Sequence, residues 1–459
     1  MISGLNRLET MYPLLCHPHA AREEIVAFQN RQLRHLITHA YNNVPYYRRL
    51  FDQNGIKPKD IQSVSDLPAI PISSKKDIQS LPMEEVVARG VNPKNLFARR
   101  TSGSSGEPLT IRRTWFEQQL FGLFRLRMMR DFGLRFTDRQ VSIGLIRERH
   151  QFDDQLPLKI IQALGLLGKV RINCLLPPED IVRLLRDLCP SILTGFSGVL
   201  LQISHIIGVE DRLSIRPRFM VAGAEVLTPL MRHQITEAFK APVFEVYASL
   251  EFSMIAWECK KTGELHTCDD NLIVEVLDDD RPVAIGERGE VVGTNLHSFA
   301  MPFIRYRLGD IVTKGSETCQ CGQPFSTIRA IQGRMLDYFP LPGGRMIHPY
   351  EITVPHVGAA SWVRQYQLIQ EREDRIILRV VPLTTPTTQE LARLQESVTT
   401  ILGQGVEFQV ILVPEIQLEP SGKFRVSRSL VKSAYDGIDW EKQQTDRLNS
   451  SSRYGNDPL

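Results

Sequence analysis

The chain has 459 residues, 42% hydrophobic and 23% charged, which is the composition of an ordinary globular protein of about two to four domains. Its formal net charge of +3 at pH 7 is small and its basic residues are dispersed, so we expect no binding to nucleic acid or to a membrane surface. No apolar run approaches the roughly 20 residues that a membrane helix needs, and we expect no signal peptide. Seven irregularly spaced cysteines indicate reduced thiols and a cytoplasmic protein.

The N-terminal half predicts helices and short strands in alternation. Residues 22–41 carry apolar side chains at near-helical spacing, and Pro45 ends the helix that they predict. Residues 109–111 form an extended run after a stretch rich in glycine and serine. A helix is expected at residues 179–188, after two prolines, and a buried strand at residues 191–193.

The clearest unit lies between residues 219 and 247. Residues 219–222 form a short apolar strand, and residues 223–225 form a turn. A helix begins at Thr228 and Pro229, because threonine caps a helix and proline suits its first turn. Residues 242–247 form the returning strand. This β-α-β order predicts an α/β domain with mixed or largely parallel sheets.

The last hundred residues differ in pattern. Residues 366–370 and 375–381 predict a hairpin, residues 388–402 predict a helix that Gly403 ends, and residues 407–413 predict a further strand. The β-β-α-β order indicates a small α+β domain.

The stretch Thr-Ser-Gly-Ser-Ser-Gly at residues 101–106 combines glycines with hydroxyl side chains. Gly103 and Gly106 let backbone N–H groups converge on a phosphate, and the hydroxyl groups add donors. A standard P-loop is disfavoured because Glu107 follows Gly106 where that motif has lysine. From this segment alone, a surface linker and a phosphate loop remain equally open.

The same stretch resembles the phosphate loop of the adenylate-forming superfamily, which includes acyl-CoA synthetases. Segments at 39–51, 66–78 and 341–352 are similar to its phenylacetate–CoA ligase branch, which has relatives in capsule biosynthesis. The resemblance spans about residues 30–435 and rests on an ordered set of further motifs, namely Gly223-Ala224-Glu225, YASLE at 247–251, YRLGD at 306–310, GRMLD at 333–337 and PSGKFR at 420–425.

This resemblance implies a domain organisation and an activity. It implies an N-terminal adenylation domain over residues 1–333 and a mobile C-terminal lid over residues 334–440. The polar composition of residues 441–459 separately predicts a disordered tail. ATP and a carboxylic acid would give an acyl-adenylate and pyrophosphate, and a thiol, with coenzyme A expected, would take the acyl group. Two alternatives stay open: transfer to an amine or a carrier protein, and a non-catalytic relative that binds a nucleotide or an acyl group.

The resemblance also implies roles for individual residues. Tyr247 would pack on adenine, Glu251 would hold Mg2+, and Asp310 would bind the ribose hydroxyls. Lys423 would bridge the carboxylate and the α-phosphate, and is with Glu251 a catalytic candidate. The remaining nucleotide-binding candidates are Thr101, Ser102, Gly103, Ser104, Ser105, Gly106, Gly223, Ala224, Glu225, Ala248, Ser249 and Arg334.

Each of these residues also has an ordinary structural interpretation. Tyr247 could be a core residue, Glu251 and Asp310 could be surface carboxylates, and Lys423 could be a solvated turn lysine. Several positions depart from the superfamily pattern and leave full activity in question, namely Glu107, Leu250, Leu308 and Leu336.

Cysteine and histidine cluster in two segments. Cys259 and His266 flank a glycine-containing turn, and Cys319 and Cys321 flank one residue. Thiolate and imidazole ligands in paired segments suit tetrahedral Zn2+ in a closed structural site, with Cys268 as a reserve ligand if His266 points away. The alternative is a set of unrelated reduced residues.

The substrate is expected to be a small carboxylic acid, aromatic or of medium chain length, because the candidate pocket walls are moderately apolar. Arg305 or Arg307 could bind a second anionic group or pair with acids on the sheet. The sequence names neither the acid nor the oligomeric state, and a homodimer stays open. The candidate walls are Phe196, Ser197, Val221, Ala222, Ser249, Met254 and Trp257.

Overall fold

A computed structural model describes most of the chain, namely residues 14–100, 109–144, 146, 169–334, 339–347, 349–357, 360–417 and 425–431. The chain divides into two compact units, Met1–Leu227 with Gln234–Gln332, and Thr228–His233 with Gly333–Leu459. Among the described residues, no helix is both long enough and apolar enough to span a membrane.

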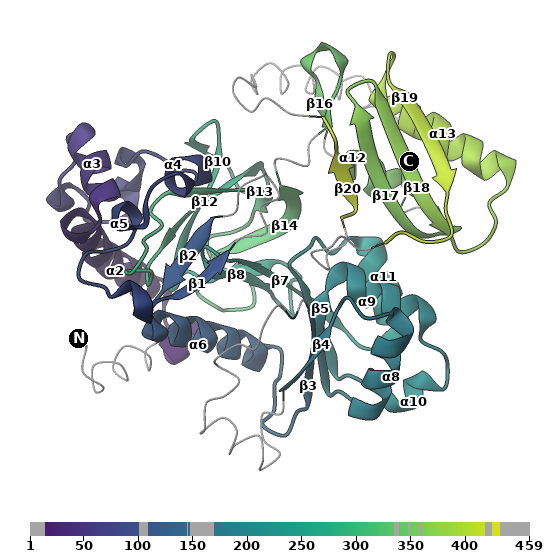
Figure 1. Cartoon of the computed structure of the whole chain (residues 1–459), viewed down its shortest axis with the longest axis horizontal. Helices are drawn as coiled ribbons and strands as arrows, with labels where there is room; N and C mark the ends of the chain where they lie inside the picture. The colour runs from purple at the N-terminus through teal and green to yellow at the C-terminus, as the bar shows by residue number, and fades with distance from the viewer. Residues whose placement is uncertain are drawn as a thin grey trace. The chain divides into compact units, whose positions relative to one another are not determined.

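A 3-10 helix at His17–His19 is followed in the larger unit by two consecutive helices (Figure 1), α2 at Arg22–Asn43 and α3 at Pro45–Gln53. Pro45 both ends α2 and starts α3, because proline lacks the N–H that continues a helix but fits the first turn of the next one. The predicted helix is therefore confirmed, two residues longer than expected. Shorter helical segments follow at Pro58–Asp60, Val64–Ala69, α4 Lys75–Gln79, α5 Met83–Val86 and Pro93–Asn95.

A twelve-stranded sheet forms the centre of this unit, with the order β11-β10-β12-β13-β14-β9-β8-β7-β6-β5-β3-β4. Strands β3 to β7 pair in parallel, whereas the β7–β8, β8–β9, β9–β14, β12–β13 and β10–β12 pairs are antiparallel. The predicted mixed α/β sheet is confirmed, with the parallel part confined to one side. The strands are β3 Gln140–Gly144, β4 Lys169–Asn173, β5 Ile192–Phe196, β6 Phe219–Gly223, β7 Val243–Ser249, β8 Ser253–Glu258, β9 Leu265–Thr267, β10 Leu272–Asp278, β11 Arg281–Pro282, β12 Arg288–Asn295, β13 Tyr306–Lys314 and β14 Thr327–Arg334.

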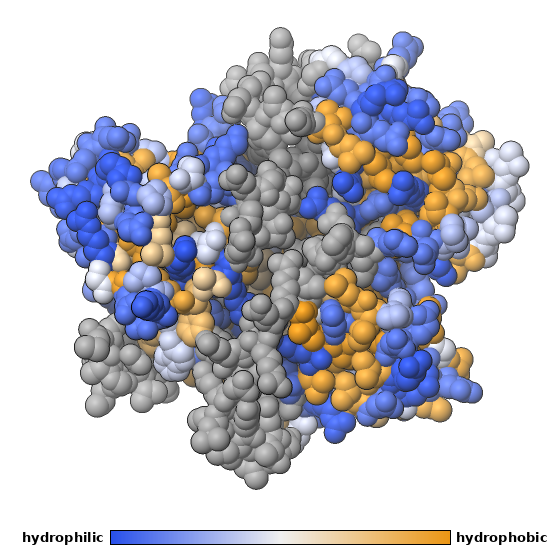
Figure 2. All heavy atoms as spheres, in the orientation of Figure 1, coloured by the Kyte–Doolittle hydropathy of each residue, from blue (hydrophilic) through white to orange (hydrophobic). Residues whose placement is uncertain are grey.

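Helices accompany the sheet. Thr114 and Glu117 form a capping box at the start of α6, Trp115–Asp131, whose apolar side chains enter the core. Helices α8 Pro178–Leu188, α9 Ser197–Ile206 and α10 Asp211–Ser214 lie together beside the parallel strands (Figure 1), and α11 spans Pro229–Phe239. Apolar surface is visible in this region (Figure 2). Leu184 of α8 and Ile206 of α9 are exposed.

A separate two-stranded hairpin joins β1 Phe97–Arg100 to β2 Thr110–Arg113. Its last pair is Arg100 with Thr110, so the glycine- and serine-rich stretch is the connection between the two strands. The extended run predicted at residues 109–111 is confirmed from Thr110 onward.

The smaller unit contains a four-stranded sheet of order β19-β18-β17-β20 and the helix α13, Thr388–Leu402. Thr387 and Glu390 cap the start of α13, and Gly403 ends it with a φ of 80°. The predicted β-β-α-β order is confirmed, and β20 was not predicted. The other elements are β15 Phe339–Pro340, a 3-10 helix Pro342–Gly344, β16 Met346–Ile347, α12 Pro349–Ile352, a π-helix Thr353–Val357, β17 Val363–Arg372, β18 Arg375–Pro382, β19 Glu407–Leu412 and β20 Ser427–Ser429.

Candidate functional site

Two of the predicted nucleotide residues meet across the large sheet. The hydroxyl of Tyr247, near the end of β7, donates a hydrogen bond of 2.6 Å to Oδ2 of Asp310 on β13, 63 positions further along the chain. The ring of Tyr247 is 7% exposed and belongs to an apolar cluster with Phe252 and Tyr306. Tyr247 is therefore a core residue whose polar end reaches the carboxylate.

A bulge in β13 sets the position of Asp310. Arg307 pairs with Val292 and Ile311 pairs with Glu290, so three residues of β13 face a single residue of β12. Gly309 lies within the bulge with a φ of 83°, a value that glycine adopts without strain. Bulges of this kind commonly redirect a side chain beside a functional site.

Arg113 ties the β1–β2 hairpin to the turn that holds Glu251. Its guanidinium donates to the backbone oxygens of Leu250 and Glu251, the latter at 3.3 Å. Burial lowers the pKa of Arg113 to about 10, with Glu117 and Glu251 acting in the opposite direction. Arg113 therefore remains protonated at neutral pH and brings a positive charge beside the Glu251 turn.

Two departures from the superfamily pattern have a packing role. Leu250 and Leu308 are partly buried and pack against the apolar cluster that contains Tyr247. An apolar side chain at either position therefore contributes to the core where the superfamily has a hydroxyl group.

The loop at residues 223–225 lies next to this site. Gly223 ends β6 and pairs with Val246 of β7, the residue before Tyr247. A Cβ atom at Gly223 would lie 2.9 Å from the backbone oxygen of Val246, so only glycine fits. Two predicted nucleotide segments therefore meet at the carboxyl ends of parallel strands, where open α/β sheets bind ligands.

Several predicted residues lie outside the described part of the chain. They are Thr101, Ser102, Gly103, Ser104, Ser105, Gly106, Glu107, Leu336 and Lys423. Arg334 is the last residue of β14, and its side chain is not among those described. Ala248 is exposed, and the hydroxyl of Ser249 accepts from the N–H of Phe252 at 3.0 Å, which closes the β7–β8 turn.

A second site brings together the four predicted zinc ligands. The ligand atoms of Cys259, His266, Cys319 and Cys321 all lie within 4.8 Å of one another. The two sulfur atoms of Cys259 and Cys319 are 3.8 Å apart, and Sγ of Cys321 is 3.2 Å from Nε2 of His266. Two sulfur atoms about 2.3 Å from one Zn2+ at the tetrahedral angle are about 3.8 Å apart. The four residues therefore fit a tetrahedral metal ion.

Strand pairing explains how these ligands meet. In the antiparallel β8–β9 hairpin, Glu258 pairs with Leu265 and Trp257 pairs with His266. Cys259 and His266 therefore lie on either side of the Glu258–Leu265 pair, as diagonal neighbours on the same face of the hairpin. The N–H groups of Lys261 and Gln323 each donate to the cysteine sulfur two positions earlier at 3.4 Å. Burial lowers the pKa of His266, which favours the neutral imidazole that binds metals.

Cys268 was expected as a ligand only if His266 pointed away; His266 lies in the cluster, and Cys268 belongs to another group of residues. Its sulfur accepts from Arg127 at 3.3 Å and lies 3.7 Å from Oδ1 of Asp270. Cys268 is fully buried, and burial holds the pKa of its thiol well above the usual range. The thiol is therefore a poor metal ligand at this position.

Sequence reasoning missed the buried polar cluster of Arg127, Asp270 and His17. The guanidinium of Arg127 contacts both carboxylate oxygens of Asp270, at 2.5 and 2.8 Å, and Nδ1 of His17 lies 2.8 Å from Oδ2. Burial alone would raise the pKa of Asp270, but Arg127 holds it well below its usual range. The only sequence signal that could have indicated this cluster was the pair of consecutive acids, Asp269 and Asp270.

Part of the expected acid pocket belongs instead to the core. Val221, Met254 and Trp257 are buried in one apolar cluster with residues of α6, because they lie on the side of the sheet that α6 covers. Arg305 pairs with Glu275 at 2.8 Å, and Arg307 lies 2.8 Å from Glu290. These arginines therefore pair with acids on the sheet.

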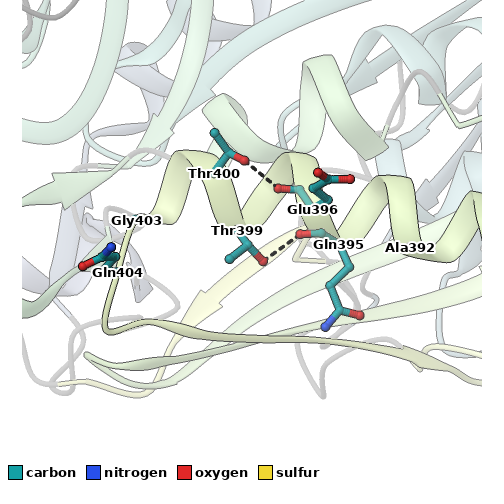
Figure 3. Close-up of a pocket in the computed structure, with 7 residues that line it drawn as sticks. All are labelled: Ala392, Gln395, Glu396, Thr399, Thr400, Gly403 and Gln404. Carbon is teal, nitrogen blue, oxygen red and sulfur yellow. Dashed lines mark hydrogen bonds between the residues drawn. The ribbon is translucent and has the colours of Figure 1, made fainter.

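A groove of about 710 Å³ lies on α13 of the smaller unit (Figure 3). The hydroxyls of Thr399 and Thr400 donate to backbone oxygens one turn earlier, at 2.7 and 2.8 Å. All its lining residues come from α13 and the turn after it, so no groups converge there from separate elements.

The chain is similar to several known proteins. Residues 341–429 match the CapK C-terminal domain family. The phenylacetate-coenzyme A ligase of Thermus thermophilus is 26% identical over 375 residues, which cover 77% of this chain and 79% of the relative. The ligase of the same name from Escherichia coli is 28% identical, covering 64% and 68%. Protein CapK of Staphylococcus aureus is 22% identical, covering 89% and 90%.

Solved structures share the fold. A 2-hydroxyisobutyryl-CoA ligase in the postadenylation state, in complex with R3-HIB-AMP, superposes with a TM-score of 0.76 at 20% identity and covers 95% of this chain and 94% of its own. An anthranilate CoA ligase in complex with anthranoyl-AMP gives a TM-score of 0.54 at 13% identity, covering 80% and 69%. The chain is therefore similar over most of its length to phenylacetate-coenzyme A ligases, and it shares the fold of the solved acyl-CoA ligase structures.

Proposed function

We propose that the chain joins a carboxylic acid to a thiol at the expense of ATP. A carboxylate oxygen of the acid attacks the α-phosphorus of ATP, which forms an acyl-adenylate and releases pyrophosphate. The thiolate of the acceptor then attacks the acyl carbon, which forms a thioester and releases AMP. Coenzyme A is the acceptor we propose, since the T. thermophilus and E. coli relatives are named phenylacetate-coenzyme A ligases.

The contact between Tyr247 and Asp310 carries this proposal, because it joins two predicted nucleotide segments beside the Gly223 loop. Asp310 would accept hydrogen bonds from the ribose hydroxyls, and the edge of Tyr247 would face adenine. Gly223 and Ala224 would border the same base.

Charge neutralisation is the physical problem in the first step, because a carboxylate must approach a triphosphate. Arg113 is a described cation beside the Glu251 turn. The residues at 101–106 would offer N–H and hydroxyl donors to the β- and γ-phosphates. Glu251 is 9% exposed, and we propose that it contributes a carboxylate oxygen to Mg2+, which would neutralise phosphate charge.

Lys423 belongs to the smaller unit, which we propose is a mobile lid. Its ammonium would bridge the carboxylate of the acid and the α-phosphate in the first step. The segment around Arg334 would be the hinge about which the lid rotates between the first and the second half-reaction.

The four-residue cluster is proposed to hold a structural Zn2+. A closed shell of Cys259, His266, Cys319 and Cys321 leaves no coordination position for substrate. The ion would join the β8–β9 hairpin to the 319–321 loop, so its role would be stability rather than catalysis.

Pyrophosphate release with a panel of acids, with and without coenzyme A, tests the proposal. We expect release with an aromatic or medium-chain acid, followed by consumption of coenzyme A. Release without consumption of coenzyme A would favour an amine or carrier-protein acceptor. Binding of ATP without release from any acid would favour a non-catalytic relative.

A further inference from the structure

Helix α9 begins directly after β5 and has no cap of its own. Phe196 occupies the N-cap position and offers no side-chain acceptor. The first N–H groups of a helix have no partner within the helix, so they need an acceptor from elsewhere. A negative charge is favoured at this position, because the helix dipole is positive at its N-terminus.

Glu225 supplies that acceptor from a distant segment. Its Oε2 atom accepts a hydrogen bond of 2.7 Å from the N–H of Gly198, in the first turn of α9. The backbone oxygen of Glu225 also accepts from the hydroxyl of Ser197, at 3.3 Å. Ser197 is fully buried. The loop after β6 is therefore fastened to α9 through both the side chain and the backbone of one residue.

The residue before Glu225 has a costly backbone conformation. Ala224 is exposed and has a φ of 65°, a left-handed value that alanine rarely adopts. Such strain persists where the surroundings over-determine it, and it gathers at ligand-binding sites. The backbone before Ala224 is held because Gly223 pairs with β7, and the backbone after it is held because Glu225 accepts a hydrogen bond from Gly198.

We infer that Glu225 is a positioning residue and does not itself contact the nucleotide. Its carboxylate, held at the start of α9, keeps Ala224 in the left-handed conformation, and this conformation presents the backbone of Gly223 and Ala224 to the adenine of ATP. The inference rests on the proposed function for the identity of the ligand. It differs from the sequence-based assignment of Glu225 to direct cofactor binding.

The experiment measures ATP binding directly, by calorimetric titration without acid, alongside the kinetics of pyrophosphate release. For Glu225→Ala we expect the Kd and the KM for ATP to rise about tenfold while kcat changes by less than about twofold, because the loop contacts ground state and transition state alike. Glu225→Gln keeps an oxygen that can accept from Gly198, so its Kd should stay within about threefold of the original.

A second substitution tests the strain itself. Glycine adopts a positive φ without cost, so Ala224→Gly in the Glu225→Ala background should recover most of the lost affinity. A merely structural role for Glu225 would not produce this rescue. Glu390→Ala is the matched control, because Glu390 accepts from the N–H of Thr387 at 2.8 Å and caps α13 in the smaller unit. The control should lose thermal stability without a change in ATP affinity.

Three results would overturn the inference. These are an unchanged Kd in Glu225→Ala, a fall in kcat at constant Kd, and a Glu225→Gln variant as weak as the alanine variant. If Glu225→Ala does not fold, Glu225→Asp, whose carboxylate is one methylene shorter, should give an intermediate Kd, and a Kd equal to the original would overturn the inference. Failure of the proposed function is a separate outcome, in which no acid releases pyrophosphate while the titration still ranks the variants.

Discussion

Asp270→Asn should strongly destabilise the larger unit. Asp270 is fully buried, and its two oxygens take donors from Arg127 at 2.5 and 2.8 Å and from His17 at 2.8 Å. An asparagine keeps one oxygen and places an N–H2 group against the other donors. Arg127 would then be a buried cation without a compensating charge, and breaking such a pair costs about 3–5 kcal/mol.

Urea unfolding followed by circular dichroism measures this loss as a shift in midpoint. Asp66→Asn is the matched control, because Asp66 also accepts three hydrogen bonds, from Gln62 and Ser63, at 2.8 to 2.9 Å, but in contact with solvent. Water can replace those bonds, so the control should shift the midpoint much less. Equal shifts in the two variants would refute the reasoning. Replacing Arg127 and Asp270 together with leucine should restore most of the loss, since no buried charge remains.

The same pair predicts a dependence on pH. The pKa of Asp270 is lowered in the folded chain, so its contribution is fully present above the unfolded carboxyl pKa of about 3.9. The contribution is lost as the pH falls below that value toward the folded pKa. Stability measured between pH 6 and pH 2 should therefore fall less steeply in Asp270→Asn than in the original chain.

Three further predictions concern the two sites. Metal analysis of untreated protein should find one zinc ion per chain. The zinc should be lost in Cys319→Ser and kept in a variant of the exposed Cys16. An equal zinc content in these two variants would exclude Cys319 as a ligand. Lys423→Ala should abolish acid-dependent pyrophosphate exchange and spare thioester formation from supplied acyl-adenylate, and undiminished exchange would exclude the proposed role. Gly223→Ala should cost about 1–3 kcal/mol, because the new Cβ lies 2.9 Å from the Val246 oxygen, and an unchanged thermal midpoint would contradict the close approach.

Local sequence signals predicted the elements that local forces determine. Helix α13 was expected at Thr388–Leu402 and is found there, because a capping box starts it and Gly403 ends it. The β-α-β unit from β6 to β7 was also predicted, because proline, threonine and apolar runs mark its parts.

Long-range pairing could not be predicted in the same way. The bulge that places Asp310 depends on which residues of β12 face β13, and a single sequence does not contain that register. The partnership of Arg127 and Asp270 joins residues 143 positions apart. Cys268 is a further example. Its position in the sequence suited a metal ligand, but the fold places its sulfur beside Arg127, in the cluster of Arg127 and Asp270.

Trp257 lies between the Cys/His cluster of Cys259, His266, Cys319 and Cys321 and the buried pair of Arg127 and Asp270. Its ring centroid lies 5.5 Å from the imidazole of His266 and 5.5 Å from the guanidinium carbon of Arg127, and its indole N–H donates to Asp131 at 2.8 Å. Indole emission responds to nearby charge and to contact with imidazole and sulfur groups. In a variant whose other tryptophans are replaced by phenylalanine, the emission of Trp257 alone would follow both metal occupancy and acid unfolding, and would serve as an internal optical reporter for both centres.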